Sequence, residues 1–126
     1  MIQSSRRNCL SLAFAAIVVF ALFLAVPSAF AHTHPEAMMP AADSTVTSPS
    51  VVMMHFSGAI EPKFSHLTVT DATGHVVNKD SSAVGGDAKS MTLAMPTLHP
   101  GVYIVNWVAV SVDSHRSQGE YKFTVK

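Results

Sequence analysis

Hydrophobic and polar residues alternate with a period of two along most of the chain after residue 50. Such alternation predicts β-strands with one buried face. The expected strands lie at residues 52–56, 67–71, 76–77, 91–95, 102–111 and 121–125, and their inward faces include Val52, Met54, Phe56, Leu67, Val69, Met91, Leu93, Met95, Tyr103, Val105, Trp107, Tyr121, Phe123 and Val125. Turn signals separate these segments, and residues 32–50, which contain three prolines, are expected to be loop or edge strand. No segment has a helical period, so the pattern predicts an all-β, immunoglobulin-like sandwich of about seven strands.

The first part of the chain has a different character. Arg6 and Arg7 precede an apolar run over residues 10–26, which ends at Ala29-Phe30-Ala31, a small-residue cleavage motif. This order is typical of a signal peptide that is removed after export. We therefore expect residues 1–31 to be cleaved and residues 32–126 to form one domain outside the cytoplasm. The arginine pair also resembles the twin-arginine export signature, and the choice of export route stays open.

Charge and cysteine content exclude several kinds of chemistry. Residues 32–126 contain six basic and eight acidic side chains, which argues against binding nucleic acid or an anionic membrane surface. The single cysteine, Cys9, lies in the expected signal peptide. The mature domain then has no disulfide and no thiolate, so metal chemistry would need histidine, carboxylate or methionine.

Four residues are the candidate metal ligands. Cleavage after Ala31 would make His32 the first residue, with a free amine beside its imidazole, and His34 the third. Asp113 and His115 follow the longest expected strand, and residues i and i+2 of extended backbone point to the same side. Three nitrogens and one oxygen suit copper(II). The alternatives are a turn-capping carboxylate for Asp113 and solvated loop histidines for His34 and His115.

The C-terminal part of the sequence resembles the CopC/PcoC family of periplasmic copper-resistance proteins. The resemblance rests on residues 100–115, with their W-x-A-V-S-x-D-x-H run, on residues 119–126, and on earlier matches at 40–43, 54–57 and 64–77. It implies a cupredoxin-like or immunoglobulin-like Greek-key barrel, a periplasmic location and a CopD-like inner-membrane transporter as partner. It also implies copper(II) bound by His32, through amine and ring, with Asp113 and His115. His34 is a further ligand or a loop residue.

The chain departs from the family in one respect. Classic members have a methionine-rich loop for copper(I), whereas the matching residues 68–77 contain no methionine. Met54, Met91 and Met95 alternate as core residues do, and Met38, Met39 and Met53 are the ones that could face solvent. The remaining histidines have no partner at ligand spacing and are expected at the surface: His55, His66, His75 and His99.

The leading hypothesis is a periplasmic protein that binds copper(II) and buffers or delivers it without catalysis. The main alternative is a histidine-brace copper monooxygenase acting on polysaccharide. Such an enzyme needs an open coordination position, which Asp113 would fill, and an aromatic surface. The chain has one tryptophan and two tyrosines, all at expected core positions. A third alternative is a structural sandwich domain that binds no metal.

Overall fold

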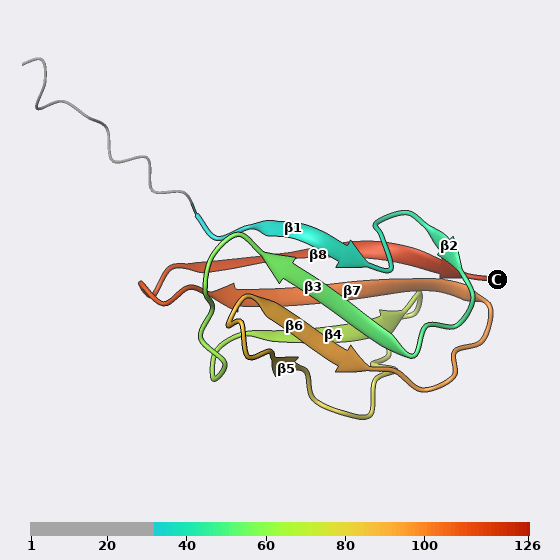
Figure 1. Ribbon diagram of the computed structural model, residues 1–126. Coiled ribbons are helices and arrows are strands. Elements are labelled where there is room, and N and C mark those ends of the chain that lie inside the picture. Colours follow the sequence, from blue (N-terminus) through green and yellow to red (C-terminus); the bar gives the residue numbers. More distant parts are fainter. Residues whose placement is uncertain (1–31) are drawn as a thin grey trace, which may run out of the picture. The chain divides into compact units, whose positions relative to one another are not determined.

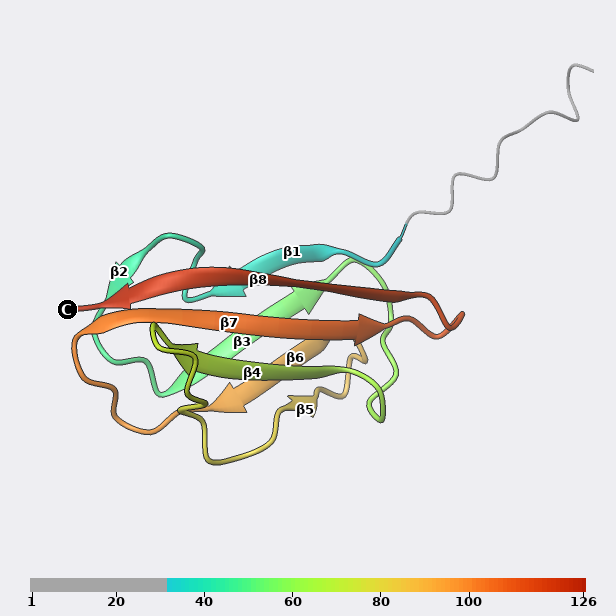
Figure 2. The same cartoon turned by 180° about the vertical axis from the view of Figure 1, so that it is seen from behind.

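The computed structural model describes residues 32–126, which form two four-stranded β-sheets (Figures 1 and 2). The first sheet has the order β1 (Pro35–Met39), β3 (Val51–Phe56), β6 (Ser90–Ala94), β5 (Ala83–Val84). The second has the order β2 (Thr45–Val46), β8 (Arg116–Val125), β7 (Gly101–Val110), β4 (His66–Asp71). All neighbouring strands are antiparallel except β2 and β8. The predicted all-β sandwich is confirmed, whereas the expected signal peptide lies outside the described residues.

The core lies between the two sheets and is built by the alternating positions. Val52, Met54 and Phe56 of β3 are fully buried, while the residues between them face outward. The other buried apolar side chains come from both sheets and the segments that join them: Ile60, Leu67, Val69, Met91, Leu93, Leu98, Tyr103, Val105, Ala109, Phe123 and Val125. Trp107, Tyr121 and Met95 are partly buried and pack against this cluster. The two-residue period therefore predicted the buried faces correctly.

One predicted strand does not form. Val76 makes only an isolated bridge with Thr70, and the edge of β4 is covered by side-chain oxygens from the following segment. The amide of Val69 donates to Asn78 Oδ1 at 2.9 Å, and the amide of Leu67 donates to Ser82 Oγ at 2.8 Å. These bonds satisfy the outer edge of β4 without a further strand. The chain then adds the two-residue strand β5, which the pattern did not predict.

The topology brings two distant segments to the same end of the sandwich. The residues that precede β1 lie beside the loop that joins β7 to β8 (Figures 1 and 2). This end holds the candidate ligands, whereas β2 and the C-terminus lie at the opposite end. Within residues 32–126 no helix is long and apolar enough to cross a membrane.

Candidate metal centre

The β7–β8 hairpin places Asp113 and His115 close together. The connecting residues 112–114 form a tight turn, in which Ser114 N donates to Ser111 O at 2.8 Å and Ser111 N donates to His115 O at 2.9 Å. Ser114 has a φ of 72°, the left-handed value typical of the last residue in three-residue hairpin loops. The expected extended backbone is therefore wrong. The two side chains converge because the chain turns between them.

Asp113 is held as a carboxylate by its neighbours. It accepts a hydrogen bond from the Ser111 hydroxyl and one from the His115 amide at 3.3 Å, and its Oδ2 lies 3.1 Å from His115 Nδ1. The Ser111 hydroxyl, followed by the ring and amide of His115, lowers the pKa of Asp113 to about 2. Both side chains are about half exposed. Asp113 is thus an ionised oxygen donor that a solvent ion can reach.

His32 comes to the same place from the other end of the chain. Its ring meets the ring of His115 edge to face, with centroids 5.7 Å apart and planes at 74°. The structure therefore brings together three of the four candidate ligands. His115 contacts both His32 and Asp113. Among residues 32–126, no three histidine, aspartate or glutamate side chains are already arranged to hold a metal ion.

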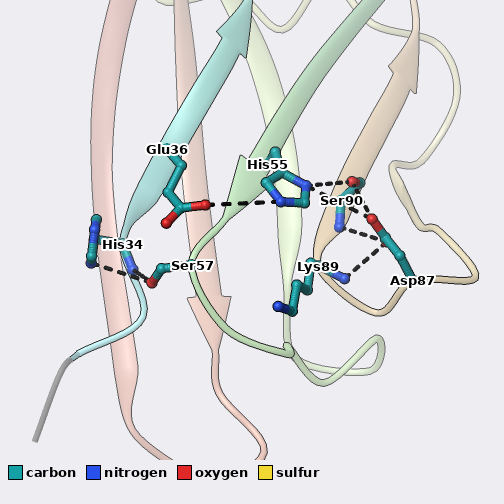
Figure 3. Close-up of polar contacts among 7 residues, drawn as sticks. All are labelled: His34, Glu36, His55, Ser57, Asp87, Lys89 and Ser90. Carbon is teal, nitrogen blue, oxygen red and sulfur yellow. Dashed lines mark hydrogen bonds and ion pairs between the residues drawn. The ribbon is translucent and has the colours of Figure 1, made fainter.

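His34 faces its own backbone and the end of β3. Its Nδ1 lies 2.9 Å from the His32 carbonyl oxygen. The same atom lies 3.3 Å from Ser57 Oγ (Figure 3). A carbonyl oxygen can only accept, so Nδ1 of His34 is the donor in the shorter contact and Nε2 holds the lone pair. The His34 amide also donates to Ser57 Oγ at 3.1 Å.

The other histidines divide into two groups. His66, His75 and His99 are exposed, as predicted, although Nδ1 of His75 lies 3.7 Å from Asp71 Oδ2 and so has a partner. His55 is not an isolated surface residue, because its Nδ1 lies 3.0 Å from Ser90 Oγ and 3.7 Å from Asp87 Oδ2 (Figure 3). Its Nε2 lies 3.9 Å from Glu36 Oε2.

The expectation that His55 lacks partners was therefore wrong. Ser90 is its cross-strand neighbour on β6, and Glu36 comes from edge strand β1. Strand register alone could have revealed the Ser90 contact. Asp87 lies near Nδ1 of the ring and Glu36 lies near Nε2. With one carboxylate at each nitrogen, His55 links three segments of the chain, and this arrangement does not suit a metal ion shared with either carboxylate.

The methionines agree with a core role for most of them. Met54 and Met91 are fully buried, and Met95 packs against the core. Met39 and Met53 are cross-strand partners on the outward face of β1 and β3, and Met39 is 54% exposed. Two thioethers without a thiolate form a sparse set of soft ligands.

Comparison with known proteins establishes the family. Residues 36–126 match the CopC domain. Copper resistance protein C of Escherichia coli is 38% identical over 107 residues, covering 79% of this chain and 85% of that one. Protein YobA of Escherichia coli strain K12 is 34% identical over 115 residues, covering 88% of this chain and 92% of YobA.

Solved structures agree. The crystal structure of CopC from Methylosinus trichosporium OB3b matches with a TM-score of 0.71 and 33% identity over 75% of this chain and 94% of that one. The crystal structure of PcoC, a methionine-rich copper resistance protein from Escherichia coli, matches with a TM-score of 0.64 and 39% identity over 76% and 100%. The chain belongs to the CopC family.

Proposed function

We propose that this protein binds one copper(II) ion in the periplasm and buffers or delivers it, without catalysing a reaction. The relatives named copper resistance proteins support the choice of metal. The absence of cysteine after residue 9 agrees with an oxidised, borderline ion held by nitrogen and oxygen. The proposed ligands are His32, through its amine and ring, with Asp113 and His115.

The observation that carries this proposal is the position of His32 against His115. A residue that precedes the first strand lies ring to ring with a residue of the last hairpin, at 5.7 Å between centroids. Asp113 Oδ2 lies 3.1 Å from Nδ1 of the same histidine. Two imidazoles and an ionised carboxylate within one small region, with an amine added by cleavage, would supply the three nitrogens and one oxygen that suit a copper(II) centre.

Binding would need a local rearrangement of side chains. Asp113 and His115 contact each other directly, so a bound ion would replace this contact with two metal–ligand bonds. Both side chains are about half exposed, and rotation about their side-chain bonds does not disturb the core. The low pKa of Asp113, about 2, means that the ion does not compete with a proton for this oxygen near neutral pH.

His34 would have a secondary part in this site. Wrapping copper(II) with the amine, two amides and the third-position ring would break the bond from the His34 amide to Ser57. It would also compete with the contact of Nδ1 with the His32 carbonyl. In the arrangement described here, His34 can join the ion only through Nε2.

The proposed location of the protein rests on its signal peptide, and the proposed partner rests on its resemblance to the CopC family. The signal peptide at residues 1–31 would export the chain, and cleavage after Ala31 would create the amine of His32. A CopD-like inner-membrane transporter is the proposed recipient of the copper. The carrier would then be competent to bind only after it has left the cytoplasm.

The free N-terminus gives the decisive test. Two forms of the protein are titrated with copper(II) against a competing chelator. The processed form begins at His32, and the extended form has one additional alanine before His32. The processed form is expected to bind one ion orders of magnitude more tightly, with paramagnetic resonance showing three nitrogen ligands. Equal affinities would overturn the proposed site. Ascorbate-driven cleavage of chitin or cellulose by the copper-loaded protein would instead favour the monooxygenase.

A further inference from the structure

The two residues after His32 are held on the sandwich by hydrogen bonds to Ser117 of β8 and to Ser57, the residue that follows β3. On one side, Ser117 Oγ of β8 lies 3.0 Å from the carbonyl oxygen of Thr33. On the other side, the Ser57 amide donates to the His34 carbonyl at 2.9 Å, and the His34 amide donates to Ser57 Oγ at 3.1 Å. The segment is therefore held between the two sheets immediately before β1 begins.

Ser117 connects this attachment directly to the candidate ligands. It is the second residue of β8 and follows His115, which closes the β7–β8 turn, by two residues. The same short stretch of backbone thus presents the His115 ring and the hydroxyl that holds Thr33. Ser117 Oγ is also 3.4 Å from the carbonyl of Ala109, its cross-strand partner on β7, and this is the longer of two contacts for the single hydroxyl proton.

Gly58 makes room for the segment on the opposite side. A Cβ at this position would lie 2.9 Å from Thr33 Oγ1, closer than such atoms approach in folded proteins. Thr33 is only partly exposed as a result, although it precedes every strand. The packing site for residues 33 and 34 is therefore formed by Ser57, Gly58 and Ser117.

We propose that Ser117 and Ser57 are positioning residues that hold the N-terminal segment so that His32 meets His115; this inference rests on the copper site proposed above. An untethered chain end must lose backbone freedom when its first residue binds an ion. A segment that is already fastened at residues 33 and 34 leaves only His32 to be ordered. Preorganisation of this kind raises affinity by lowering the entropic cost of binding.

The test combines Ser117→Ala with the N-terminal alanine extension. In the processed protein, Ser117→Ala is expected to weaken copper(II) binding by roughly 3–10-fold, the range given by loss of one hydrogen bond. In the extended protein, in which His32 has no free amine, the same substitution should leave the residual affinity unchanged. Ser117→Thr, which keeps the hydroxyl, should restore binding in the processed protein. Ser44→Ala is the matched control, because Ser44 Oγ bonds the Ala41 carbonyl at the other end of the sandwich.

A measurement without copper separates this inference from the copper site itself. In the metal-free processed protein, nuclear Overhauser contacts between the rings of His32 and His115 should be present in the wild type. They should be lost or weakened in Ser117→Ala and Ser57→Ala. Unchanged contacts and unchanged affinity in both variants would overturn the positioning role, even if copper binds as proposed. Equal binding by processed and extended wild type would overturn the copper site and the positioning role with it.

Discussion

Trp107 lies against Gly119, its cross-strand partner on β8, so closely that no side chain fits between them. A Cβ on Gly119 would be 2.9 Å from Cζ2 of the indole and 3.1 Å from its Nε1. The indole also meets Phe56 of the opposite sheet edge to face, with centroids 5.6 Å apart. The tryptophan is thus fixed between the two sheets, and glycine is required for its position.

Gly119→Ala should therefore destabilise the fold. Overpacking of this kind costs about 1–3 kcal/mol in free energy of unfolding, because the indole or the strand must shift. Chemical denaturation, followed by the fluorescence of the single tryptophan, measures the change. Gly86→Ala is the control, since a Cβ there meets nothing within 4 Å. Equal stability of the two variants would show that the indole moves aside freely.

Tyr121→Phe should leave stability unchanged or raise it. Tyr121 Oη is buried without a hydrogen-bond partner among residues 32–126, and removing an unsatisfied group recovers up to about 1 kcal/mol. Tyr103→Phe should instead destabilise by about 1 kcal/mol, because the Tyr103 hydroxyl donates to the His99 carbonyl at 2.7 Å. Thermal unfolding of the two variants at neutral pH compares these effects.

The raised pKa of Tyr121 predicts a loss of stability at alkaline pH. Burial raises the pKa of Tyr121 from 10.0 to about 12, so the folded state keeps this proton where the unfolded state releases it. The contribution of the Tyr121 proton to the free energy of unfolding is present below about pH 10 and is lost as the pH rises toward 12. Tyr121→Phe should lack this part of the decline. Parallel pH–stability curves for wild type and variant would contradict the assignment.

Asp113→Ala and His115→Ala should each weaken copper(II) binding while the fold stays intact. Both side chains lie in the β7–β8 turn and are about half exposed, and such substitutions usually change stability by under about 1 kcal/mol. Competition titration and thermal unfolding of the same samples separate the two effects. Unfolding with unchanged affinity in the folded fraction would identify them as structural caps of the hairpin.

Copper(II) affinity should fall steeply between about pH 8 and pH 5, with protons released on binding. Amines and imidazoles ordinarily titrate near 7.7–8.0 and near 6.5, so protons compete with the ion in this range. The pKa of Asp113 is about 2, and its carboxylate stays charged throughout. Asp113→Asn should therefore lower affinity by the same factor at every pH in the range. A change in the slope of affinity against pH would show that the carboxylate, or a group coupled to it, titrates in this range.

Reduction to copper(I) should loosen or eject the metal. Met39, which is exposed, and its half-buried cross-strand partner Met53 offer two soft ligands, and residues 32–126 contain no cysteine. Titration of the reduced protein against a copper(I) chelator should reveal no second tight site. A stoichiometric tight site that disappears in the Met39→Leu, Met53→Leu double variant would overturn this prediction.

The alternating pattern was sufficient to predict the fold class and most of the core. Val52, Met54 and Phe56 are buried, as are Leu67 and Val69, because a two-residue period leaves only one way to hide an apolar face. The pattern was insufficient at Val76, where the short apolar pair makes a bridge and not a strand. Side chains of Asn78 and Ser82 satisfy the edge of β4 there, and periodicity does not record such bonds.

The sequence by itself determined which side chains are available: an imidazole that processing would expose, a D-x-H pair after the longest strand, and no thiol. Only the tertiary structure decided that His32 lies against His115, that Ser114 turns the backbone, and that Ser117 holds Thr33. It also decided that Trp107 needs Gly119 and that His55 has partners on two strands. The physical reason is the same in each case. Local periodicity records which face of a strand is buried, whereas these contacts depend on strand order, register and the closing of two sheets on each other.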